Sequence, residues 1–320
     1  MPPLITIKVP ATSANLGSGF DTIGMALSLN NVFKVMEILP RCEYKIEAVG
    51  EGAKELSSPK ANLVITAYEK TCELWGVQGP GFALWCHNII PLCRGLGSSA
   101  GAVVAGVLIA KYLTGYAADE AELLRAMTII EGHPDNVAPC FLGGMVVSCW
   151  DGKDLKYVRL PELPREVLCV VAVPDERVKT SDARNALPKQ VAFSDAIFNV
   201  GHAALLTAAW ATGKWDYLKW GMEDKLHQQY RSKLFSGGDA ILSRVSELPE
   251  CLSIAISGSG PSILALVRGS SDRVAKTMCS IFTEHGVRSQ FFVLDGSSLG
   301  ARLSLSQQFT EMNVKPEVKK

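Results

Sequence analysis

The sequence predicts a two-domain protein in which both domains mix helices and strands. With 320 residues, the chain exceeds the roughly 100–200 residues of one domain. Alternating apolar residues indicate strands at 4–9, 32–38, 44–49, 82–90, 145–150, 167–173, 252–256, 263–267 and 289–294. Helical spacing indicates helices at 62–75, 98–113, 119–131, 182–220 and 272–285. A polar stretch at 151–165 carries two prolines, so we expect the domains to be residues 1–160 and 161–320. We expect a loop at 11–21 and a frayed tail after Gln307.

Composition excludes several classes of protein. The 32 basic and 32 acidic side chains cancel, so no overall field attracts nucleic acid or an anionic membrane. The longest apolar run, 101–110, falls short of the ~20 residues that a spanning helix needs. The N-terminus lacks the pattern of a signal peptide. Nine cysteines, none in a C-x-x-C pair, indicate reduced thiols, and we expect a cytoplasmic protein.

A glycine-rich segment, PLCRGLGSSAG at 91–101, lies between a predicted strand and a predicted helix. Gly95 and Gly97 permit a tight turn, and Ser98 opens the helix. The first amides of a helix lack intrahelical partners and lie at the positive end of its dipole. The segment therefore predicts a phosphate cradle, to which Arg94 adds a positive charge. Serine hydroxyls there can bind phosphate or Mg²⁺.

Two other interpretations of this segment stay open. Serine before an apolar helix is also an ordinary N-cap. The spacing G-x-G-x-x-A, with Asp119 and Glu120 about 20 positions later, fits a loose dinucleotide-binding pattern, although Pro91 and the late position in the chain argue against it. A Walker loop is excluded, because neither Gly-Lys pair, at 152 and 213, is followed by Ser or Thr.

The segment EGHPDN at 131–136 joins two predicted helices. Gly132 ends the first helix, and Pro134 suits the first turn of the second. Glu131 then lies in a last helical turn, where the dipole disfavours a carboxylate unless a cation or solvent compensates it. His133 is more simply a local cap or a buried partner than a ligand.

Three further charged residues carry weaker signals. Thr180 and Ser181 are typical of an N-cap, which predicts Arg184 in a first helical turn, where a cation needs a nearby anion. Arg231 by itself is compatible with a surface position, and Asp21 with a turn. The residues alone do not join these signals into one site.

Together, the segments PATSANLGSGFDTIGMAL, PLCRGLGSSAGAVVAGVL, EGHPDNVAPCFLGGM and ISGSGPSILAL make the chain resemble the homoserine kinases, a family of the GHMP small-molecule kinase superfamily. The resemblance runs from about Pro10 to about Leu266. The glycine segment alone indicates the superfamily, whereas the first segment and EGHPDNVAP indicate homoserine kinases. Cys93 departs from a pattern that favours Gly, Ser, Thr or Ala, and it brings a thiol close to the nucleotide.

The resemblance implies an α+β fold of two domains, the first like domain 2 of ribosomal protein S5 and the second ferredoxin-like, with the substrate between them. It implies ATP as cofactor, with its adenine near Asn62. The phosphates would lie on Pro91, Leu92, Cys93, Arg94, Gly95, Leu96, Gly97, Ser98, Ser99, Ala100 and Gly101. Ser98 and Glu131 would hold Mg²⁺ and, with Asn136, form the catalytic set.

The implied substrate is L-homoserine, a zwitterion with a terminal hydroxyl. Arg184 and Arg231 would bind its carboxylate with Thr180 nearby, and Asp21 its ammonium. Asn15, His133 and Asn136 would surround the hydroxyl end, and Gly258 and Gly260 of a third glycine loop would border the substrate. The implied reaction is phosphorylation of that hydroxyl in threonine biosynthesis, by positioning and metal without a dedicated general base. Members of the family are often dimers, so a homodimer is expected.

Two rival interpretations stay open. Another GHMP kinase would act on mevalonate or shikimate, which lack an ammonium group. A non-catalytic sensor would keep the fold and bind nucleotide to control a partner.

Overall fold

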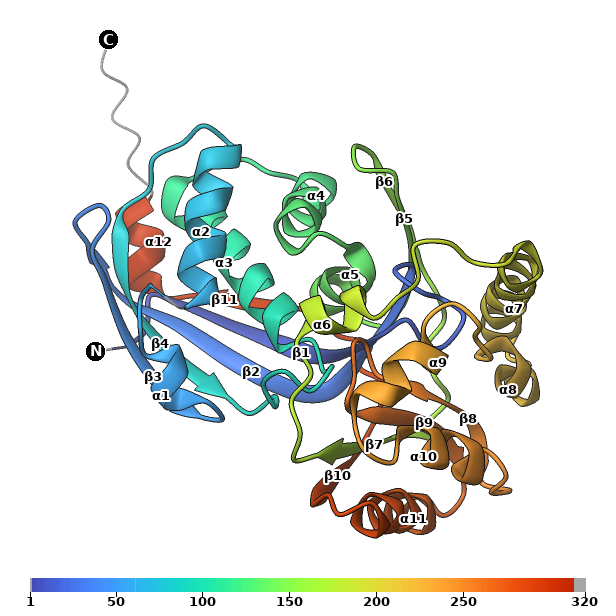
Figure 1. Cartoon of the computed structure of the whole chain (residues 1–320). Helices are drawn as coiled ribbons and strands as arrows, with labels where there is room; N and C mark the ends of the chain where they lie inside the picture. The colour runs from blue at the N-terminus through green and yellow to red at the C-terminus, as the bar shows by residue number, and fades with distance from the viewer. Residues whose placement is uncertain (1, 61, 314–320) are drawn as a thin grey trace.

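The computed structural model in Figure 1 describes residues 2–60 and 62–313, which form two sheets. The first sheet has seven strands in the order β11-β1-β2-β4-β3, and a hairpin of β5 and β6 joins it through β2. Only β3 and β4 pair in parallel in this sheet of the described chain. Its strands are β1 (Ile5–Ala14), β2 (Ile23–Leu39), β3 (Tyr44–Gly50), β4 (Gly81–Asn88), β5 (Met145–Trp150), β6 (Leu155–Arg159) and β11 (Arg302–Leu305).

Helices cover one face of this sheet, where α2 to α5 lie above the strands in Figure 1. Their apolar faces meet the strands in one core, in which Val103 and Val107 of the third helix pack with Ile7 and Val35. These helices are α2 (Leu63–Leu74), α3 (Ser98–Thr114), α4 (Glu120–Glu131), α5 (Pro134–Leu142) and α12 (Gln307–Asn313). The short α1 (Ala53–Leu56) follows β3 and buries none of its residues.

The second sheet has four antiparallel strands in the order β10-β7-β9-β8. Its strands are β7 (Val167–Pro174), β8 (Cys251–Ile256), β9 (Ile263–Arg268) and β10 (Ser289–Leu294). Its helical elements are α6 (Thr180–Asn185), α7 (Phe193–Ala211), η1 (Trp215–Tyr217), α8 (Leu218–Gly221), α9 (Gln228–Arg231), η2 (Ser232–Leu234), α10 (Gly238–Val245) and α11 (Ser271–Glu284). Helices follow β7 and β9, so the order is the β-α-β-β-α-β of a ferredoxin-like unit, as predicted.

The two sheets share a hydrophobic core that lies between them. Val171 and Leu264 of the second sheet pack in one cluster with Met25 and Leu27 of β2. The opposite face of the second sheet packs on α10 and α11. Loops at the ends of strands from both sheets therefore meet along a rigid seam.

The predicted loop at 11–21 is wrong at its start, because β1 continues to Ala14. The first half of β2, from Ile23, was also not predicted. Residues 11–14 and 23–27 are buried throughout, so apolar and polar positions do not alternate there. Without that alternation, a strand buried on both faces lacks its main sequence signal.

Three further segments depart from expectation. The polar stretch at 151–165 contains β6, an edge strand. Its exposed charged side chains gave the segment the sequence pattern of a loop. The expected frayed tail is wrong for residues 307–313, which form α12 with Phe309 buried. β11 pairs with β1, so the chain returns to the first sheet after the second is complete. The predicted domain boundary at residue 160 did not include this return of the chain to the first sheet. The boundary itself stays a prediction. No helix of the described residues is long and apolar enough to cross a membrane.

Candidate active site

The glycine segment at 91–97 leads directly into α3. Gly97 is the N-cap of this helix, with φ 69°, and no side chain among the described residues caps it. The interpretation of a serine N-cap is therefore wrong, because Ser98 and Ser99 already lie within the helix. The first amides of α3 are left for a ligand, which is the arrangement that an anion requires.

Contacts from both sheets hold this segment and explain its glycines. A Cβ on Gly97 would lie 1.9 Å from Thr12 Oγ1, and one on Gly95 would lie 2.1 Å from the carbonyl oxygen of Ser257. The Ser257 hydroxyl lies 2.7 Å from the Gly95 carbonyl oxygen and 2.8 Å from Ser13 Oγ. The loop between β8 and β9 thus braces the segment from the second sheet, and only glycine fits at these contacts.

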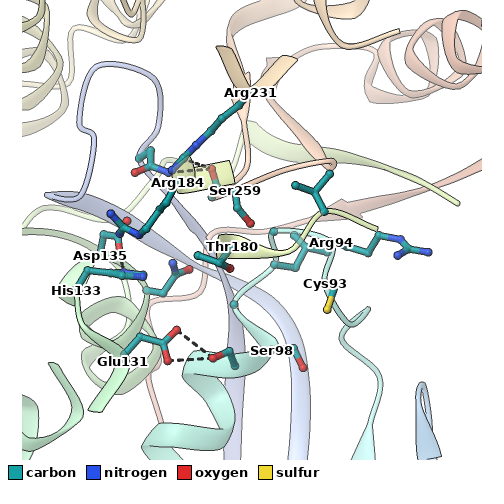
Figure 2. Close-up of a pocket in the computed structure, with 18 of the residues that line it drawn as sticks. Cys93, Arg94, Ser98, Glu131, His133, Asp135, Thr180, Arg184, Arg231 and Ser259 are labelled. Carbon is teal, nitrogen blue, oxygen red and sulfur yellow. Dashed lines mark hydrogen bonds and ion pairs between the residues drawn. The ribbon is translucent and has the colours of Figure 1, made fainter. Parts of the chain in front are cut away.

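One pocket along the seam brings together most of the predicted residues (Figure 2). It is lined by Asn15, Asp21, Pro91, Cys93, Arg94, Gly95, Leu96, Gly97, Ser98, Ser99, Glu131, His133, Asn136, Thr180, Arg184, Arg231 and Gly258. Asp135, Val178 and Ser259 also line it and were not predicted. Leu92 and Asn62 line a neighbouring pocket, whereas Ala100, Gly101 and Gly260 are buried.

Glu131 ends α4 as predicted, with Gly132 as its C-cap. Burial raises the pKa of its carboxyl, although nearby His133 and a hydrogen bond from Ser99 lower it. The Ser99 hydroxyl lies 3.1 and 3.0 Å from the two carboxylate oxygens, at the dashed lines of Figure 2. Ser98 lines the same pocket, but the direct contact to Glu131 comes from its neighbour. The side chains of consecutive residues in a helix project about 100° apart, so only one of the two serines faces Glu131. Their spacing along the sequence did not show which of them it is.

The start of α5 supplies a dyad and an oriented amide. His133 Nδ1 contacts Asp135, which is 2% exposed. Burial lowers the pKa of His133, but its hydrogen bond and charge interaction with Asp135 outweigh this effect and raise the pKa overall. Thr12 donates a hydrogen bond of 2.8 Å to Oδ1 of Asn136, which fixes its carboxamide. The sequence carried no signal for Thr12, since that contact spans 124 positions.

Asp21 and Arg184 form a bidentate ion pair, with N–O distances of 2.9 and 2.8 Å. The Asp21 amide donates to Oδ1 of Asn15 at 3.0 Å, which fixes the turn. Arg184 lies in the last turn of α6, not in the first turn as predicted, because this helix starts at Thr180 and has only six residues. The prediction of a nearby anion therefore rested on a wrong position of Arg184 within the helix, although Asp21 supplies such an anion.

Arg231 is buried and not a surface residue, with 2% of its area exposed. It donates to the Gly258 carbonyl oxygen at 2.9 Å, and its guanidinium lies 5.0 Å from the ring centroid of Phe20. Its Nε is buried without a hydrogen-bond partner in the described structure. Burial lowers its pKa, but arginine keeps its charge near neutral pH. A buried cation with an unsatisfied N–H calls for an anionic ligand.

Arg94 and Cys93 differ from expectation in detail. Arg94 extends away from Glu131 in Figure 2, and its Nη2 lies 3.3 Å from Asp175. Its charge is thus shared with a carboxylate and not aimed solely at a phosphate. Cys93 has φ 53°, a left-handed conformation, which explains why glycine is one of the four residues favoured there but does not explain Ser, Thr or Ala.

A second pocket adjoins the first at Cys93, Ser98 and Ser99. Most of its remaining wall is apolar and includes Phe33, Leu63, Val64, Leu92 and Ala102. Asn62 lies in it as the N-cap of α2: Oδ1 accepts from the Val64 amide at 3.0 Å, and Nδ2 donates to the Leu56 carbonyl at 2.8 Å. An apolar pocket beside a phosphate cradle suits a nucleobase.

The fold and the pocket define a class: an α+β small-molecule kinase of the GHMP type, whose members use ATP. The family model described as GHMP kinases N terminal domain matches residues 62–144. A protein of Carboxydothermus hydrogenoformans named homoserine kinase is 42% identical over 298 residues, covering 93% of this chain and 96% of that protein. A homoserine kinase of Moorella thermoacetica is 40% identical over 88% of this chain and 94% of its own.

A crystal structure of homoserine kinase from Cytophaga hutchinsonii superposes with a TM-score of 0.83 at 29% identity, covering 95% of this chain and 98% of that one. The chain therefore belongs to the homoserine kinase family. The α+β GHMP kinase fold predicted from the resemblance is confirmed.

Proposed function

We propose that this chain transfers the γ-phosphoryl group of ATP to the hydroxyl of L-homoserine, giving O-phospho-L-homoserine for threonine biosynthesis. One observation carries the proposal: a single pocket combines an uncapped helix N-terminus with side chains of both charges. Arg184 and Arg231 complement a carboxylate, and Asp21 complements an ammonium. A hydroxylated amino acid and a nucleoside triphosphate together supply a partner of the right charge for each of these groups.

Magnesium suits the oxygen donors at the start of α3 and the end of α4. Glu131 offers a carboxylate and Ser98 and Ser99 offer hydroxyls, and Mg²⁺ prefers oxygen ligands. The contact between Ser99 and Glu131 favours these two as the protein ligands, with Ser98 bonded to a phosphate oxygen. When bound, the ion would neutralise part of the triphosphate charge.

The chain's own residues act mainly by positioning. Asn136, fixed by Thr12, would orient the homoserine hydroxyl toward the γ-phosphorus, where an O–P bond forms as the bond to the β-phosphate oxygen breaks and ADP leaves. The pKa of His133 is raised, which favours the charged imidazole, and in that form the ring cannot accept a proton. The hydroxyl proton would therefore pass late, to the transferred phosphoryl group or to water.

A coupled assay of ADP release with L-homoserine, mevalonate and shikimate tests the proposal, with ³¹P NMR to identify the product. We expect turnover with L-homoserine at least ~100-fold more efficient than with the other two. Turnover of mevalonate or shikimate with equal efficiency would identify a different kinase. Absence of transfer to any of them would favour the sensor.

The charges of the pocket argue against both rivals. Mevalonate and shikimate lack an ammonium group, so they would leave Asp21 and nearby Asp135 without a cationic partner from the substrate. A sensor that only binds nucleotide does not need Glu131 and Ser99 in contact beside the phosphate cradle. A homodimer stays a prediction from the family resemblance, and a cytoplasmic location stays a prediction from the cysteine pattern.

A further inference from the structure

The helix α7 exposes apolar side chains on its outer face. Its inner face packs in the core shared by the two sheets, where Leu206 and Trp210 are buried. A helix with one face in a core normally carries charged and polar residues on the other face. The outer face of α7 carries instead Phe193, Ile197 and Val200, which are 81%, 58% and 72% exposed. Apolar surface of this extent is typical of a site of protein association.

These side chains belong to one continuous strip along the helix. They recur at spacings of four and three residues, so they share a face. This α7 strip consists of the exposed residues Phe193, Ile197, Val200, Gly201, Ala204, Ala208 and Ala211. None of these residues is charged, and the strip lies outside the described lining of the active-site pocket.

We propose that the α7 strip is the docking surface for a second copy of this chain, with the two α7 helices packed antiparallel around a two-fold axis. The expected homodimer did not specify which surface pairs. The proposal is independent of the proposed function, because the strip and the active-site pocket are different surfaces.

The distribution of large and small side chains along the strip favours a second copy. Phe193, Ile197 and Val200 occupy the N-terminal half, and the three alanines occupy the C-terminal half. Antiparallel packing around a two-fold axis places the large half of each helix against the small half of the other. The large side chains then fill the space beside the alanines, as close packing requires. In this register Val200 of one copy faces Ala204 of the other, close to the axis.

The size of the strip fits a dimer interface. The 19 residues of α7 span about 28 Å, and the exposed apolar surface of the strip is roughly 400 Å² on each copy. A standard interface takes about 800 Å² from each partner, of which roughly 57% is apolar. The strip therefore supplies most of the apolar area that such an interface needs, and polar surface around it supplies the rest.

The helix is held firmly, so the strip is presented in one orientation. Trp210 Nε1 donates to the Pro161 carbonyl oxygen at 2.7 Å. Asn199 donates to Oδ1 of Asp224 at 2.9 Å and accepts from the Lys225 amide at 2.8 Å. A surface that is already ordered pays less entropy on docking. In Figure 1, α7 lies at the outer edge of the molecule, where a second copy can approach.

The remaining sequence of this chain is a poor alternative occupant. Residues 1, 61 and 314–320 lie outside the described ranges, and only the last of these segments is longer than one residue. It reads VKPEVKK, in which four of seven residues are charged. A segment of this composition is unsuited to cover an apolar strip.

The test is the oligomeric state of the full chain, measured by analytical ultracentrifugation over a range of micromolar concentrations. The variants are Val200→Lys and Ala204→Glu, which each place a charge in the strip close to the axis. Val158→Lys, at a 61% exposed position on the edge strand β6, is the matched control for the same substitution elsewhere. Circular dichroism of each variant establishes that it is folded.

We expect the wild type and Val158→Lys to be dimers. In each strip variant the dissociation constant of the dimer should rise at least ~100-fold, because an unpaired charge is buried on each side of the axis. An equimolar mixture of the two strip variants should form dimers again, since the lysine of one chain then faces the glutamate of the other. A monomeric wild type, strip variants that stay dimeric, or a mixture that stays monomeric would overturn the proposal.

Discussion

Ser99 and Glu131 stand on different helices, yet the serine hydroxyl lies 3.1 and 3.0 Å from the two oxygens of the glutamate. The contact joins the first turn of α3, where phosphate is expected, to the last turn of α4. An acid beside a phosphate cradle is the arrangement that a metal-assisted phosphoryl transfer needs.

Replacing Glu131 by Gln tests this assignment. We expect kcat to fall roughly 100-fold, with the dissociation constant for L-homoserine within about twofold, because the metal acts mainly on the transition state. Steady-state kinetics and calorimetry measure the two quantities. Glu120→Gln, in the first turn of the same helix and bonded to Tyr157, is the control and should keep its activity. Unchanged kcat in Glu131→Gln would remove the acid from the mechanism.

The two serines can be separated by a matched pair of substitutions. Ser99→Ala should lower kcat about tenfold and raise the Mg²⁺ concentration needed for half-maximal rate, since Ser99 contacts Glu131. Ser98→Ala should instead raise KM for ATP with less effect on the Mg²⁺ requirement. The reverse result would assign the metal to Ser98, as the family resemblance implies.

Arg231→Gln tests the carboxylate site. Loss of a buried cation should weaken binding of L-homoserine by about 2–5 kcal/mol, measured as a rise in its KM, while KM for ATP stays within about threefold. Arg244→Gln, an exposed arginine paired with Glu284, controls for loss of charge. If the KM for homoserine does not move, the carboxylate binds elsewhere.

Gly97→Ala tests the shape of the phosphate cradle against a well-matched control. Gly97 and Gly115 stand at opposite ends of α3, both with φ 69°. A Cβ on Gly97 would meet Thr12 Oγ1 at 1.9 Å, whereas one on Gly115 would meet no atom of the part of the chain that the structure describes within 4 Å. The left-handed conformation should cost both substitutions about 1–2 kcal/mol of stability, and the overlap with Thr12 adds to that cost at Gly97 alone. Only Gly97→Ala should also raise KM for ATP, by at least about tenfold. Equal kinetics in the two variants would contradict the predicted role of the segment.

The His133–Asp135 dyad predicts a pH dependence of stability. Because the pKa of His133 is raised in the folded chain, its contribution is fully present below its ordinary value of 6.5 and is lost as pH rises through the raised pKa. The free-energy difference of unfolding between wild type and His133→Gln should therefore be larger near pH 6 than near pH 9. Denaturant unfolding measures it. In an Asp135→Asn background the difference should no longer depend on pH in this way, and its persistence there would assign the effect to another group.

Local patterns in the sequence predicted what depends on local structure. Gly97, Glu131 and Gly132 lie where helix-end reasoning put them, because the end of a helix is determined by neighbouring residues. The contacts of Thr12 and Asp135 could not be predicted in this way, since they depend on tertiary packing. Arg184 was assigned to the substrate through the family resemblance, while the local argument for it was wrong.

The most direct test of the account is a crystal structure with Mg²⁺, a non-hydrolysable ATP analogue and L-homoserine. The account requires the γ-phosphate at the N-terminus of α3, the homoserine hydroxyl facing it, and the amino-acid end between Asp21 and the two arginines at 184 and 231. Triphosphate bound away from Gly97, or homoserine outside this pocket, would contradict it.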